Sequence, residues 1–324
     1  MKALIPAAGI GTRLRPHTLN KPKALLPVAG KPILGHIIDD LRAAGVRDFV
    51  IVVGFEGDAV RAWCRGAYPD LSVAYVEQRE RLGLGHAVWT AREAVGHAPF
   101  FCILGDTILK ADYQALLGSP VSAVAVREVA DPRRFGVADV REGRVLRFVE
   151  KPDVPPSNLA LVGAYLFHDA PALWTALDRV VGGGIRTRDE YQLTDALQLM
   201  VAAGTEFRVV PVTDWYDCGK PEAWLATNRV LLDREPGRAP QGSLPPCAIA
   251  PDARVSGSRL GPYVTVGPGA VIVDSELSDC VVGAGAEIRD CRLRESLIGE
   301  RAVVNGLIGS VNIGDWCEIA TAPR

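Results

Sequence analysis

Residues 2–14 read KALIPAAGIGTRL: a short apolar run is followed at once by a loop that contains two glycines. An apolar run of this length predicts a buried β-strand, and glycines allow the backbone to turn and to approach a ligand closely. Backbone N–H groups that follow such a strand can donate to phosphate oxygens. This stretch therefore predicts a strand that leads into a phosphate-binding loop.

Two common phosphate-binding fingerprints do not fit the loop. A dinucleotide fingerprint needs a third small residue where Leu14 stands, and a P-loop needs a Gly-Lys-Ser/Thr sequence that is missing here. Five cations follow the glycines instead, at Arg13, Arg15, Lys21, Lys23 and Lys31. Guanidinium forks and ammonium groups can share the oxygens of a triphosphate. A flexible surface loop with solvated charges is the alternative interpretation of this stretch alone.

Strand-like and helix-like patterns alternate from here to about residue 230. We expect strands at 2–7, 48–53, 72–76 and 100–104, and helices at 33–44, 57–65 and 86–94. Residues 100–104 are apolar throughout, which is typical of a strand that is covered on both faces. The order predicts an α/β fold with a doubly wound, mostly parallel, Rossmann-like sheet.

The sequence changes character after about Leu232. Residues 233–248 are rich in Pro, Gly and Arg, which is typical of a linker. From Ile249 a branched apolar residue returns every five or six positions and often precedes Gly, as at Val266-Gly267 and Val282-Gly283. This spacing is typical of hexapeptide repeats in a short left-handed parallel β-helix, which we expect at 249–324. A β-sandwich with glycine turns is the alternative.

Composition narrows the class of protein. The chain is 48% hydrophobic and 23% charged, with a net charge of -2. These values are typical of soluble globular proteins and do not favour binding to nucleic acid or to an anionic membrane. The 7 cysteines form no CxxC pair, which argues against a disulfide framework or a zinc site. Neither a signal peptide core nor a membrane-spanning stretch is apparent, so we expect a cytoplasmic protein.

Two motifs carry a resemblance to a known family. Residues 9–16, GIGTRLRP, and residues 21–28, KPKALLPV, resemble the signature of the NDP-sugar pyrophosphorylases, and long-form glucose-1-phosphate thymidylyltransferases most of all. The resemblance implies a nucleotidyltransferase catalytic domain at 1–232. It also implies an enzyme that joins a nucleoside triphosphate to a sugar 1-phosphate, releases pyrophosphate and needs Mg²⁺. We expect dTTP and glucose 1-phosphate as substrates, with UTP as the alternative.

The family pattern assigns nucleotide-binding residues in this sequence. They are Ala7, Ala8, Gly9, Gly11, Thr12, Arg13, Lys23, Gln78 and Gly83. The resemblance implies that the Gln78 amide and the Gly83 backbone read a pyrimidine base, and an amide can both donate and accept. His86 is interpreted as a helix-start or packing residue, because the attacking phosphate is already an anion and needs no strong base.

Two aspartates are the expected metal ligands. Asp106 follows the apolar strand at 100–104, and the carboxyl ends of parallel strands are where such sheets bind ligands. Asp217 lies in the sequence WYDCG at 215–219. Two carboxylates plus phosphate oxygens and waters suit Mg²⁺. With Arg13 and Lys23, they form the expected catalytic set. Thr107 departs from the Asn or Asp that many relatives carry, so no contact is assigned to it.

The sugar phosphate is expected to bind a third group of residues. The resemblance assigns this role to Gly136, Glu150, Lys151, Gly163 and Tyr165. Neighbours on a strand usually face opposite sides, although the Pro after Lys151 can bend the strand. Residues 190–195, EYQLTD, resemble another family segment that we assign to structure or subunit contact.

Three further expectations concern the tail and the whole chain. The β-helix is expected to serve oligomerisation or regulation, with a dimer or tetramer of this chain as the assembly. A bifunctional enzyme with an acetyltransferase tail is one rival, but the tail offers no histidine as a base. A catalytically inactive regulatory subunit is the other, and the intact Arg13, Lys23, Asp106, Lys151 and Asp217 argue against it.

Overall fold

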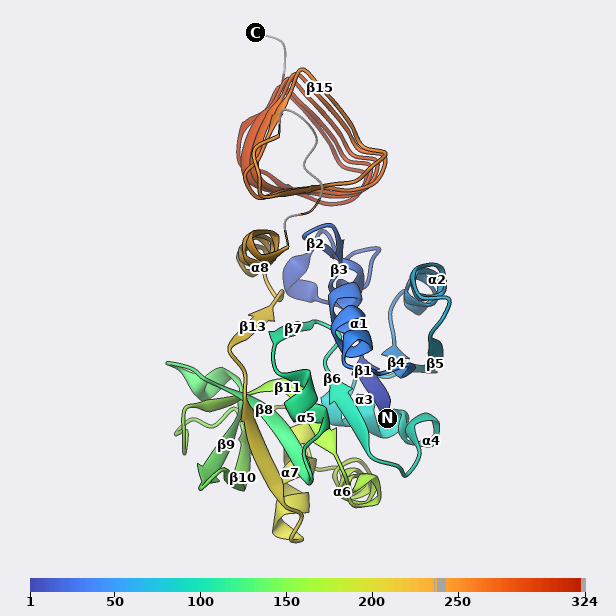
Figure 1. The fold of residues 1–324 in the computed structure, drawn as a ribbon, viewed down its shortest axis with the longest axis vertical. Coiled ribbons are helices and arrows are strands. Elements are labelled where there is room, and N and C mark those ends of the chain that lie inside the picture. Colours follow the sequence, from blue (N-terminus) through green and yellow to red (C-terminus); the bar gives the residue numbers. More distant parts are fainter. Residues whose placement is uncertain (236, 238–242, 322–324) are drawn as a thin grey trace. The chain divides into compact units, whose positions relative to one another are not determined.

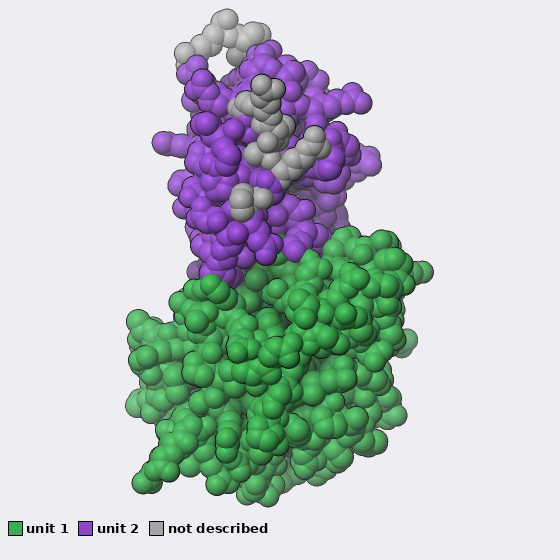
Figure 2. All heavy atoms as spheres, viewed as in Figure 1, with its two compact units in different colours: residues 1–9, 36–215 green, residues 10–35, 216–324 purple. Residues whose placement is uncertain are grey.

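The computed structural model describes residues 1–235, 237 and 243–321. Contacts divide the chain into unit 1, residues 1–9 and 36–215, and unit 2, residues 10–35 and 216–324 (Figure 2). Residues 10–35 and 216–232, which the sequence suggested as part of the α/β domain, therefore group with the C-terminal strands. Of the expected linker at 233–248, residues 236 and 238–242 lie outside the described residues.

Unit 1 is built on one sheet with the expected α/β character (Figure 1). Its strands run in the order β5 (Ser72–Glu77), β4 (Asp48–Val53), β1 (Lys2–Pro6), β6 (Phe100–Ile103), β11 (Leu159–Phe167), β8 (Ser122–Glu128), β12 (Phe207–Pro211), β10 (Arg144–Glu150) and β9 (Gly136–Arg141). All four residues of β6 are buried, as the apolar run at 100–104 predicted.

The expectation of a mostly parallel sheet is wrong for one half of it. Strands β5, β4, β1 and β6 are mutually parallel, but β11 is antiparallel to both β6 and β8, and β9 is antiparallel to β10. In the β9–β10 hairpin, the antiparallel pairing follows from the turn, because Glu142 and Gly143 both have positive φ. A two-residue turn of this kind reverses the chain and forces an antiparallel pairing.

Helices cover the sheet of unit 1. They are α1 (Ile33–Ala43), α2 (Gly57–Ala67), α3 (Leu84–Thr90), α4 (Arg92–Val95), α5 (Tyr113–Leu117), α6 (Ala170–Gly182) and α7 (Leu193–Ala202), with a 3₁₀ turn η3 (Pro132–Arg134). The Asp169 carboxylate accepts from the Ala172 N–H at 2.9 Å and so caps the start of α6. Within the described residues, none of the helices is long and apolar enough to cross a membrane.

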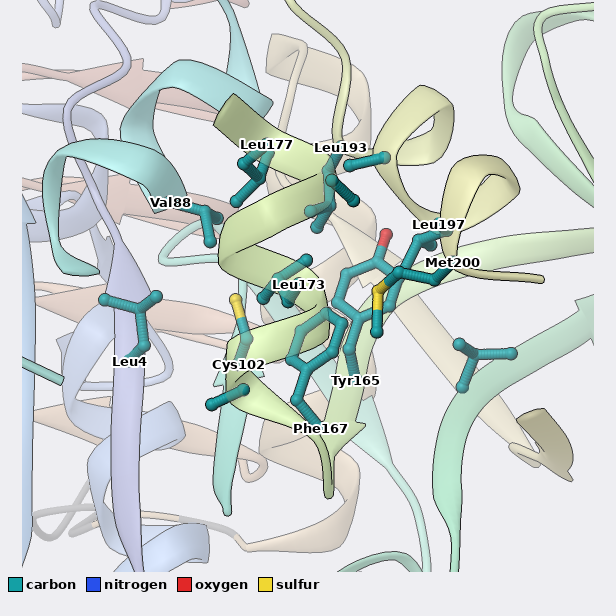
Figure 3. Packing of buried hydrophobic residues seen from close by; sticks show 14 of the residues in the cluster. Leu4, Val88, Cys102, Tyr165, Phe167, Leu173, Leu177, Leu193, Leu197 and Met200 are labelled. Atoms are coloured by element: carbon teal, nitrogen blue, oxygen red, sulfur yellow. The ribbon is translucent and has the colours of Figure 1, made fainter. Parts of the chain in front are cut away.

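One hydrophobic core of unit 1 lies between the sheet and three helices, α3, α6 and α7. Figure 3 shows Leu173 and Leu177 of α6 and Leu197 of α7 packed over the side chains of the strands. Phe100 stacks on Trp174 with 5.4 Å between ring centroids. This packing buries large apolar side chains and fixes the strands whose ends carry the candidate site.

Unit 2 begins with the stretch that carries the family resemblance. It contains the 3₁₀ turns η1 (Thr12–Leu14) and η2 (Lys23–Leu25), the short strands β2 (Pro27–Val28) and β3 (Lys31–Pro32), and the start of α1. Strand β7 (Thr107–Lys110) of unit 1 pairs with β13 (Asp214–Asp217), whose last two residues belong to unit 2 and lead into α8 (Pro221–Arg234). Pro221 stands in the first turn of α8, where a missing N–H costs nothing.

The remaining strands of unit 2 form two parallel sheets. One contains β14 (Cys247–Ile249), β16 (Arg259–Leu260), β17 (Val264–Val266), β19 (Glu276–Val282), β21 (Arg292–Ile298), β23 (Ile308–Gly309) and β24 (Asn312–Ile313). The other contains β15 (Arg254–Ser256), β18 (Val271–Val273), β20 (Glu287–Arg289), β22 (Val303–Asn305) and β25 (Glu318–Ala320). Figure 1 shows these strands stacked as a three-sided coil, and we call residues 247–320 the coil.

Aliphatic ladders fill the interior of the coil, as the spacing of apolar residues predicted. Val266 pairs with Val282 and Val282 with Ile298, while Ile272 pairs with Ile288 on another side. Ile308 breaks the pattern: it is 76% exposed, because its rung places Gly309 beside Leu293 and leaves Ile308 beside Arg292. The repeat therefore predicted most of this core and misplaced one residue near its end.

Candidate functional site

The loop that follows β1 is held at the carboxyl edge of the parallel strands. The Ala7 N–H donates to the Val52 carbonyl of β4 at 2.8 Å, and the Gly105 N–H donates to the Pro6 carbonyl at 2.9 Å. A Cβ on Gly105 would lie 2.7 Å from the Ala7 Cβ, and one on Gly54 would lie 2.9 Å from the Ala8 carbonyl oxygen. Ala7 and Ala8 therefore lie in close contact with the ends of neighbouring strands, whereas Gly9 is exposed and a Cβ on it would meet nothing within 4 Å.

Asp106 stands at the same edge, directly after β6 and Gly105. The Thr107 hydroxyl donates to its Oδ1 at 3.4 Å. The Leu104 N–H donates to the Gly163 carbonyl at 2.9 Å, and a Cβ on Gly163 would lie 2.6 Å from the Leu104 Cδ1. Gly163 has a φ of 86°. The absence of its side chain thus makes room for Leu104 and fixes the strand end that presents Asp106.

Gln78 follows β5 at this edge and is 6% exposed. Its backbone N–H donates to the Val53 carbonyl at 2.8 Å. The side-chain Nε2 donates to the Gly83 carbonyl at 3.2 Å and lies 3.0 Å from the His86 Nδ1. Gln78 and Gly83, which the sequence assigned to base recognition, are therefore in direct contact, and His86 joins them.

The segment at residues 190–192 supports Gly83 from outside the predicted site. The Tyr191 N–H donates to the Leu82 carbonyl and the Gly85 N–H donates to the Tyr191 carbonyl, both at 2.8 Å. A Cβ on Gly83, whose φ is 110°, would lie 2.6 Å from the Tyr191 carbonyl oxygen. Only glycine fits this position. The segment that we assigned to structure or subunit contact thus holds the Gln78–Gly83 pair in place.

Glu150 and Lys151 lie at the end of β10 with their side chains together. The Lys151 Nζ is 3.2 Å from the Glu150 Oε1, and the Thr194 hydroxyl donates to the Glu150 Oε2 at 2.7 Å. Strand neighbours normally face opposite sides, but Lys151 has a φ of 41°, which turns the chain there. A Cβ on Gly136 would lie 2.8 Å from the Thr194 Oγ1 and 3.0 Å from the Glu150 Oε2. Gly136 therefore leaves space around this acid–base pair.

The structure places Tyr165 differently from the other expected sugar residues. Its side chain is 4% exposed and lies in the apolar core, with its ring 6.1 Å from that of Phe167 (Figure 3). Burial raises the pKa of its hydroxyl well above the usual range. This position is that of a core residue, and its assignment to the sugar phosphate is a prediction that the geometry does not favour.

Sequence reasoning missed two side chains beside Glu150. One is Thr194, which donates to it; the other is Asp195, whose Oδ2 is enclosed and has no hydrogen-bond partner in the described part of the chain. Burial raises the pKa of Asp195, and the negative charge of Glu150 raises it further. The motif EYQLTD at 190–195 was the available signal, since it resembles a family segment.

In unit 2, Lys23 and Asp217 form an ion pair with 3.3 Å between Nζ and Oδ1. Lys23 is 6% exposed, and a Cβ on Gly11 would lie 3.1 Å from the Lys23 Cβ. A Cβ on Gly219 would lie 2.9 Å from the Arg13 Nη2 and 2.8 Å from the Asp217 Oδ1. The two glycines therefore let three of the expected catalytic side chains come together in this unit.

Thr12 and Gly11 shape the turn that carries Arg13. Gly11 has a φ of 70°, and its carbonyl accepts from the Thr18 hydroxyl at 2.9 Å and from the Leu14 N–H at 2.8 Å. Thr12 is the first residue of η1, and Arg13 is exposed. The positive φ at Gly11 reverses the chain so that it returns toward Lys23.

Other residues of the same stretch are bound by the coil. The Lys21 ammonium pairs with the carboxylates of Glu300 and Asp315, and the second Nζ–Oδ2 distance is 3.7 Å. The His17 Nε2 lies 2.6 Å from the Asn312 Oδ1. Lys21, which we counted among the phosphate-facing cations, is thus neutralised by acids that are far away in the sequence.

The two aspartates expected to bind Mg²⁺ can be judged only by the chemistry of their carboxylate oxygens. Asp106 belongs to unit 1 and Asp217 to unit 2. Among the residues that the structure describes, no group of three or more His, Cys, Asp or Glu side chains is arranged to hold a metal ion. The expected site would need only two carboxylates, with phosphate and water oxygens as the other ligands. None of the seven cysteines, all of which lie in the described part of the chain, forms a disulfide, and six of them are buried.

Comparison with known proteins places this geometry in a family. The family described as nucleotidyl transferase matches residues 2–234. A glucose-1-phosphate thymidylyltransferase from Streptomyces griseus is 35% identical over 315 residues, which is 87% of each chain. The low-salt glycan biosynthesis nucleotidyltransferase Agl11 from Haloferax volcanii is 33% identical over 343 residues, 93% of each chain. The chain belongs to the nucleotidyl transferase family and is an enzyme of that class.

Its relatives narrow the class further. The UTP–glucose-1-phosphate uridylyltransferase AglF from Haloferax volcanii is 35% identical over 235 residues, 68% of this chain and 93% of that protein. A crystal structure of UDP-glucose pyrophosphorylase complexed with UDP-glucose superimposes with a TM-score of 0.64 at 28% identity, covering 72% of this chain and 99% of the other. These similarities place the protein among the NDP-sugar pyrophosphorylases.

Proposed function

We propose that the protein makes dTDP-glucose and pyrophosphate from dTTP and glucose 1-phosphate. The observation that carries the proposal is the gathering of Ala7–Gly9, Gln78 and Asp106 at one edge of the parallel strands, where α/β sheets bind ligands. Relatives named glucose-1-phosphate thymidylyltransferase that span most of the chain support this choice of substrates.

UTP is the second candidate for the nucleotide. Thymine and uracil present the same hydrogen-bonding edge, so the Gln78–Gly83 pair suits both bases. They differ by one methyl group, which discriminates only weakly in an apolar pocket. The similarity to uridylyltransferases and to a UDP-glucose pyrophosphorylase favours this alternative.

The proposed reaction needs little acid–base chemistry. An oxygen of the sugar phosphate attacks the α-phosphorus in line, and the bond from that phosphorus to the bridging oxygen breaks. Pyrophosphate then leaves with the electron pair. Arg13 would stabilise the leaving pyrophosphate, and Lys23 would neutralise charge near the reacting phosphorus. The Arg13–Gly219–Asp217 cluster and the Lys23–Asp217 pair support these roles.

The sugar phosphate would bind at the end of β10. Glu150 has two oxygens that suit sugar hydroxyls, and Lys151 offers an ammonium group beside it for the phosphate. The space left by Gly136 and the anchoring hydrogen bond from Thr194 support this assignment. Holding the anionic nucleophile in a fixed place contributes to the rate by orientation.

The residues present suit Mg²⁺, a hard cation that prefers oxygen ligands. Asp106 and Asp217 would supply carboxylate oxygens, and the phosphates of the substrate the rest. When bound, the ion would offset negative charge on the phosphates. The Lys23 ammonium beside Asp217 would have to share that carboxylate with the ion.

We propose that the coil is a left-handed β-helix and that it supports a homo-oligomer, dimer or tetramer. Its parallel rungs and its aliphatic ladders support the first assignment. Light scattering of the full chain measures the oligomeric state, and a monomer at all concentrations would contradict the second. We also propose a reducing, cytoplasmic setting, which the buried and unbridged cysteines support.

The test of the reaction is pyrophosphate release by the purified full chain. The assay contains Mg²⁺ and glucose 1-phosphate, and each of dTTP, UTP, CTP, ATP and GTP is added separately. We expect release with dTTP and a smaller or equal rate with UTP. The absence of pyrophosphate release with all five nucleotides, and with mannose 1-phosphate and N-acetylglucosamine 1-phosphate in place of glucose 1-phosphate, would contradict the proposal. It would favour a non-catalytic subunit.

A further inference from the structure

The contacts of Gln78 fix which end of its amide faces outward. The Gly83 carbonyl oxygen lies 3.2 Å from the Gln78 Nε2 position, and a carbonyl can only accept. The group at this position must therefore be the NH₂ group. The chemistry of Gly83 thus assigns the amide orientation without reference to any ligand.

The same orientation assigns the protonation of His86. The second N–H of the amide points to the His86 Nδ1, which is 3.0 Å away and must accept. His86 is then neutral, with its proton on Nε2. Burial lowers the pKa of His86, and the charge of Glu80 opposes this only in part. Its ring lies against Trp89 and Tyr191, with centroid distances of 5.8 and 6.4 Å.

With both N–H groups engaged, the Oε1 of Gln78 is the atom left to meet a base. None of the described residues donates a hydrogen bond to it. An oxygen can only accept, so it matches the ring N–H of uracil or thymine at position 3. Cytosine carries a lone pair at that position and would be repelled.

We propose that His86 is a positioning residue that selects uracil and thymine over cytosine by fixing the Gln78 amide. The inference rests on the proposed function, because it concerns the base of the nucleotide substrate. It extends to pH. A protonated His86 carries a proton on Nδ1 and cannot accept from the Gln78 amide, so it no longer holds Oε1 outward and the preference over cytosine weakens.

The surroundings of His86 contain few groups that could titrate in its place. Charged and titratable residues near it or near its aromatic neighbours are Glu80, Glu190, Tyr191, Arg92 stacked on Trp89, Asp178 bonded to Trp89 and Arg186 stacked on Tyr191. Histidine is the only one of these side-chain types whose ordinary pKa, about 6.5, lies between pH ~5 and ~8. A transition between pH ~5 and ~7 therefore belongs to His86.

The test compares His86→Leu with His86→Asn in the full chain. Leucine removes the acceptor, whereas the Asn Oδ1 can accept near the position of Nδ1. We expect His86→Leu to raise KM for UTP and dTTP about tenfold, to leave kcat within about twofold, and to lower the UTP-to-CTP preference about tenfold. His86→Asn should restore the preference. Wild-type preference should fall with pH below ~6, and that of His86→Asn should not.

Binding measurements separate this inference from the proposed reaction. Calorimetry gives Kd for UTP and CTP without any sugar phosphate, so it works even if no turnover is found. Weaker UTP binding in His86→Leu, with Asn rescue, supports the inference. An unchanged UTP-to-CTP ratio in a folded His86→Leu protein overturns it. If His86→Leu does not fold, the pH dependence of wild type against His86→Asn decides, and a flat wild-type ratio overturns the proposal.

Discussion

The edge of the parallel sheet in unit 1 and the cationic stretch in unit 2 place their functional residues by different means. At the edge, Gln78 directly follows the half-exposed β5 and Asp106 comes shortly after the buried β6, and backbone hydrogen bonds between neighbouring strands fix both. In unit 2, the stretch at 10–35 is held by partners more than a hundred residues away, such as Asn228, Glu300 and Asn312. The first arrangement depends on strand ends, which local sequence patterns reveal, and the second on side-chain contacts, which they do not reveal.

Within one signature motif, the same comparison distinguishes a residue of the proposed catalytic set from a residue that anchors the motif to the coil. Lys21 and Lys23 stand two positions apart, yet Lys23 pairs with Asp217 while Lys21 pairs with acids of the coil. At the last rung, a Cβ on Gly314 would lie 2.8 Å from the Pro16 Cβ, so the loop packs closely against the end of the coil. The coil thus supports the stretch that carries Arg13 and Lys23.

The largest effect is expected at the sheet edge, from Asp106→Asn. The change keeps the shape of the side chain and removes its charge, so kcat should fall roughly 100- to 1000-fold with little change in Tm. Steady-state kinetics at saturating Mg²⁺ and thermal unfolding measure the two quantities. The exposed Asp252→Asn is the matched control. Near-normal turnover of Asp106→Asn would remove this residue from the catalytic set.

A large loss of stability is expected in unit 2, from Asn228→Ala. The Asn228 side chain is fully buried; its Oδ1 accepts from the Ala29 N–H and the Thr265 hydroxyl, and its Nδ2 donates to the Tyr263 carbonyl. Removing it leaves buried polar groups unpaired and should lower the free energy of unfolding by about 2–4 kcal/mol. Urea denaturation measures this. Asn158→Ala, at an exposed hydrogen bond to Glu128, should cost far less.

A moderate effect is expected where the coil binds the cationic stretch. If Lys21 acts through Glu300, Lys21→Met and Glu300→Gln should each raise KM for the nucleotide about three- to tenfold, and the double variant should be no worse than either. If Lys21 instead binds phosphate, Lys21→Met alone will be harmful and Glu300→Gln will be nearly neutral. Initial-rate kinetics on the three variants decide between the two roles.

The smallest effect is a change of stability with pH at His17. Burial lowers the pKa of His17, although Asn312 and Asp315 oppose the shift. The folded state therefore favours the neutral ring. Its contribution is complete above the unfolded pKa of about 6.5 and is lost as pH falls through the lower folded pKa.

The measurement is urea unfolding of wild type and His17→Gln at pH ~7.5 and ~5.5. The stability advantage of wild type should shrink as the pH falls, because the unfolded chain takes up the proton first. A difference between the two proteins that stays constant with pH would mean that His17 does not titrate in this range.

Much of the fold follows from local patterns in the sequence. The buried strand at Phe100–Ile103, the helix at Gly57–Ala67 and most aliphatic ladders of the coil lie where periodicity predicts them. The antiparallel pairings in the second half of the sheet were missed, because they depend on a hairpin turn and on pairings between distant strands. Ile308 was misplaced because a repeat gives spacing but not the register of the last rung.

For the candidate site, too, some residues were predictable from the sequence and others were not. Glycines and strand ends located the loop at Ala7–Gly9 and Asp106, because residues that end neighbouring parallel strands meet at one edge, whereas Gln78 was assigned by the family resemblance. The link from Gln78 to His86 and the support from Tyr191 were not visible, since they depend on side-chain geometry. The burial of Tyr165 was also not visible, because its strand lies between two others in the core.

By itself, the sequence determined the family, the α/β sheet with its phosphate-binding loop, and the repeating tail, because these depend on periodicity and on short motifs. Only the tertiary structure decided that Lys21 and His17 contact the coil, that Glu150 and Lys151 point together, and that His86 contacts Gln78. Such pairings arise when chain folding brings distant residues within a few ångströms, and no local pattern encodes that proximity.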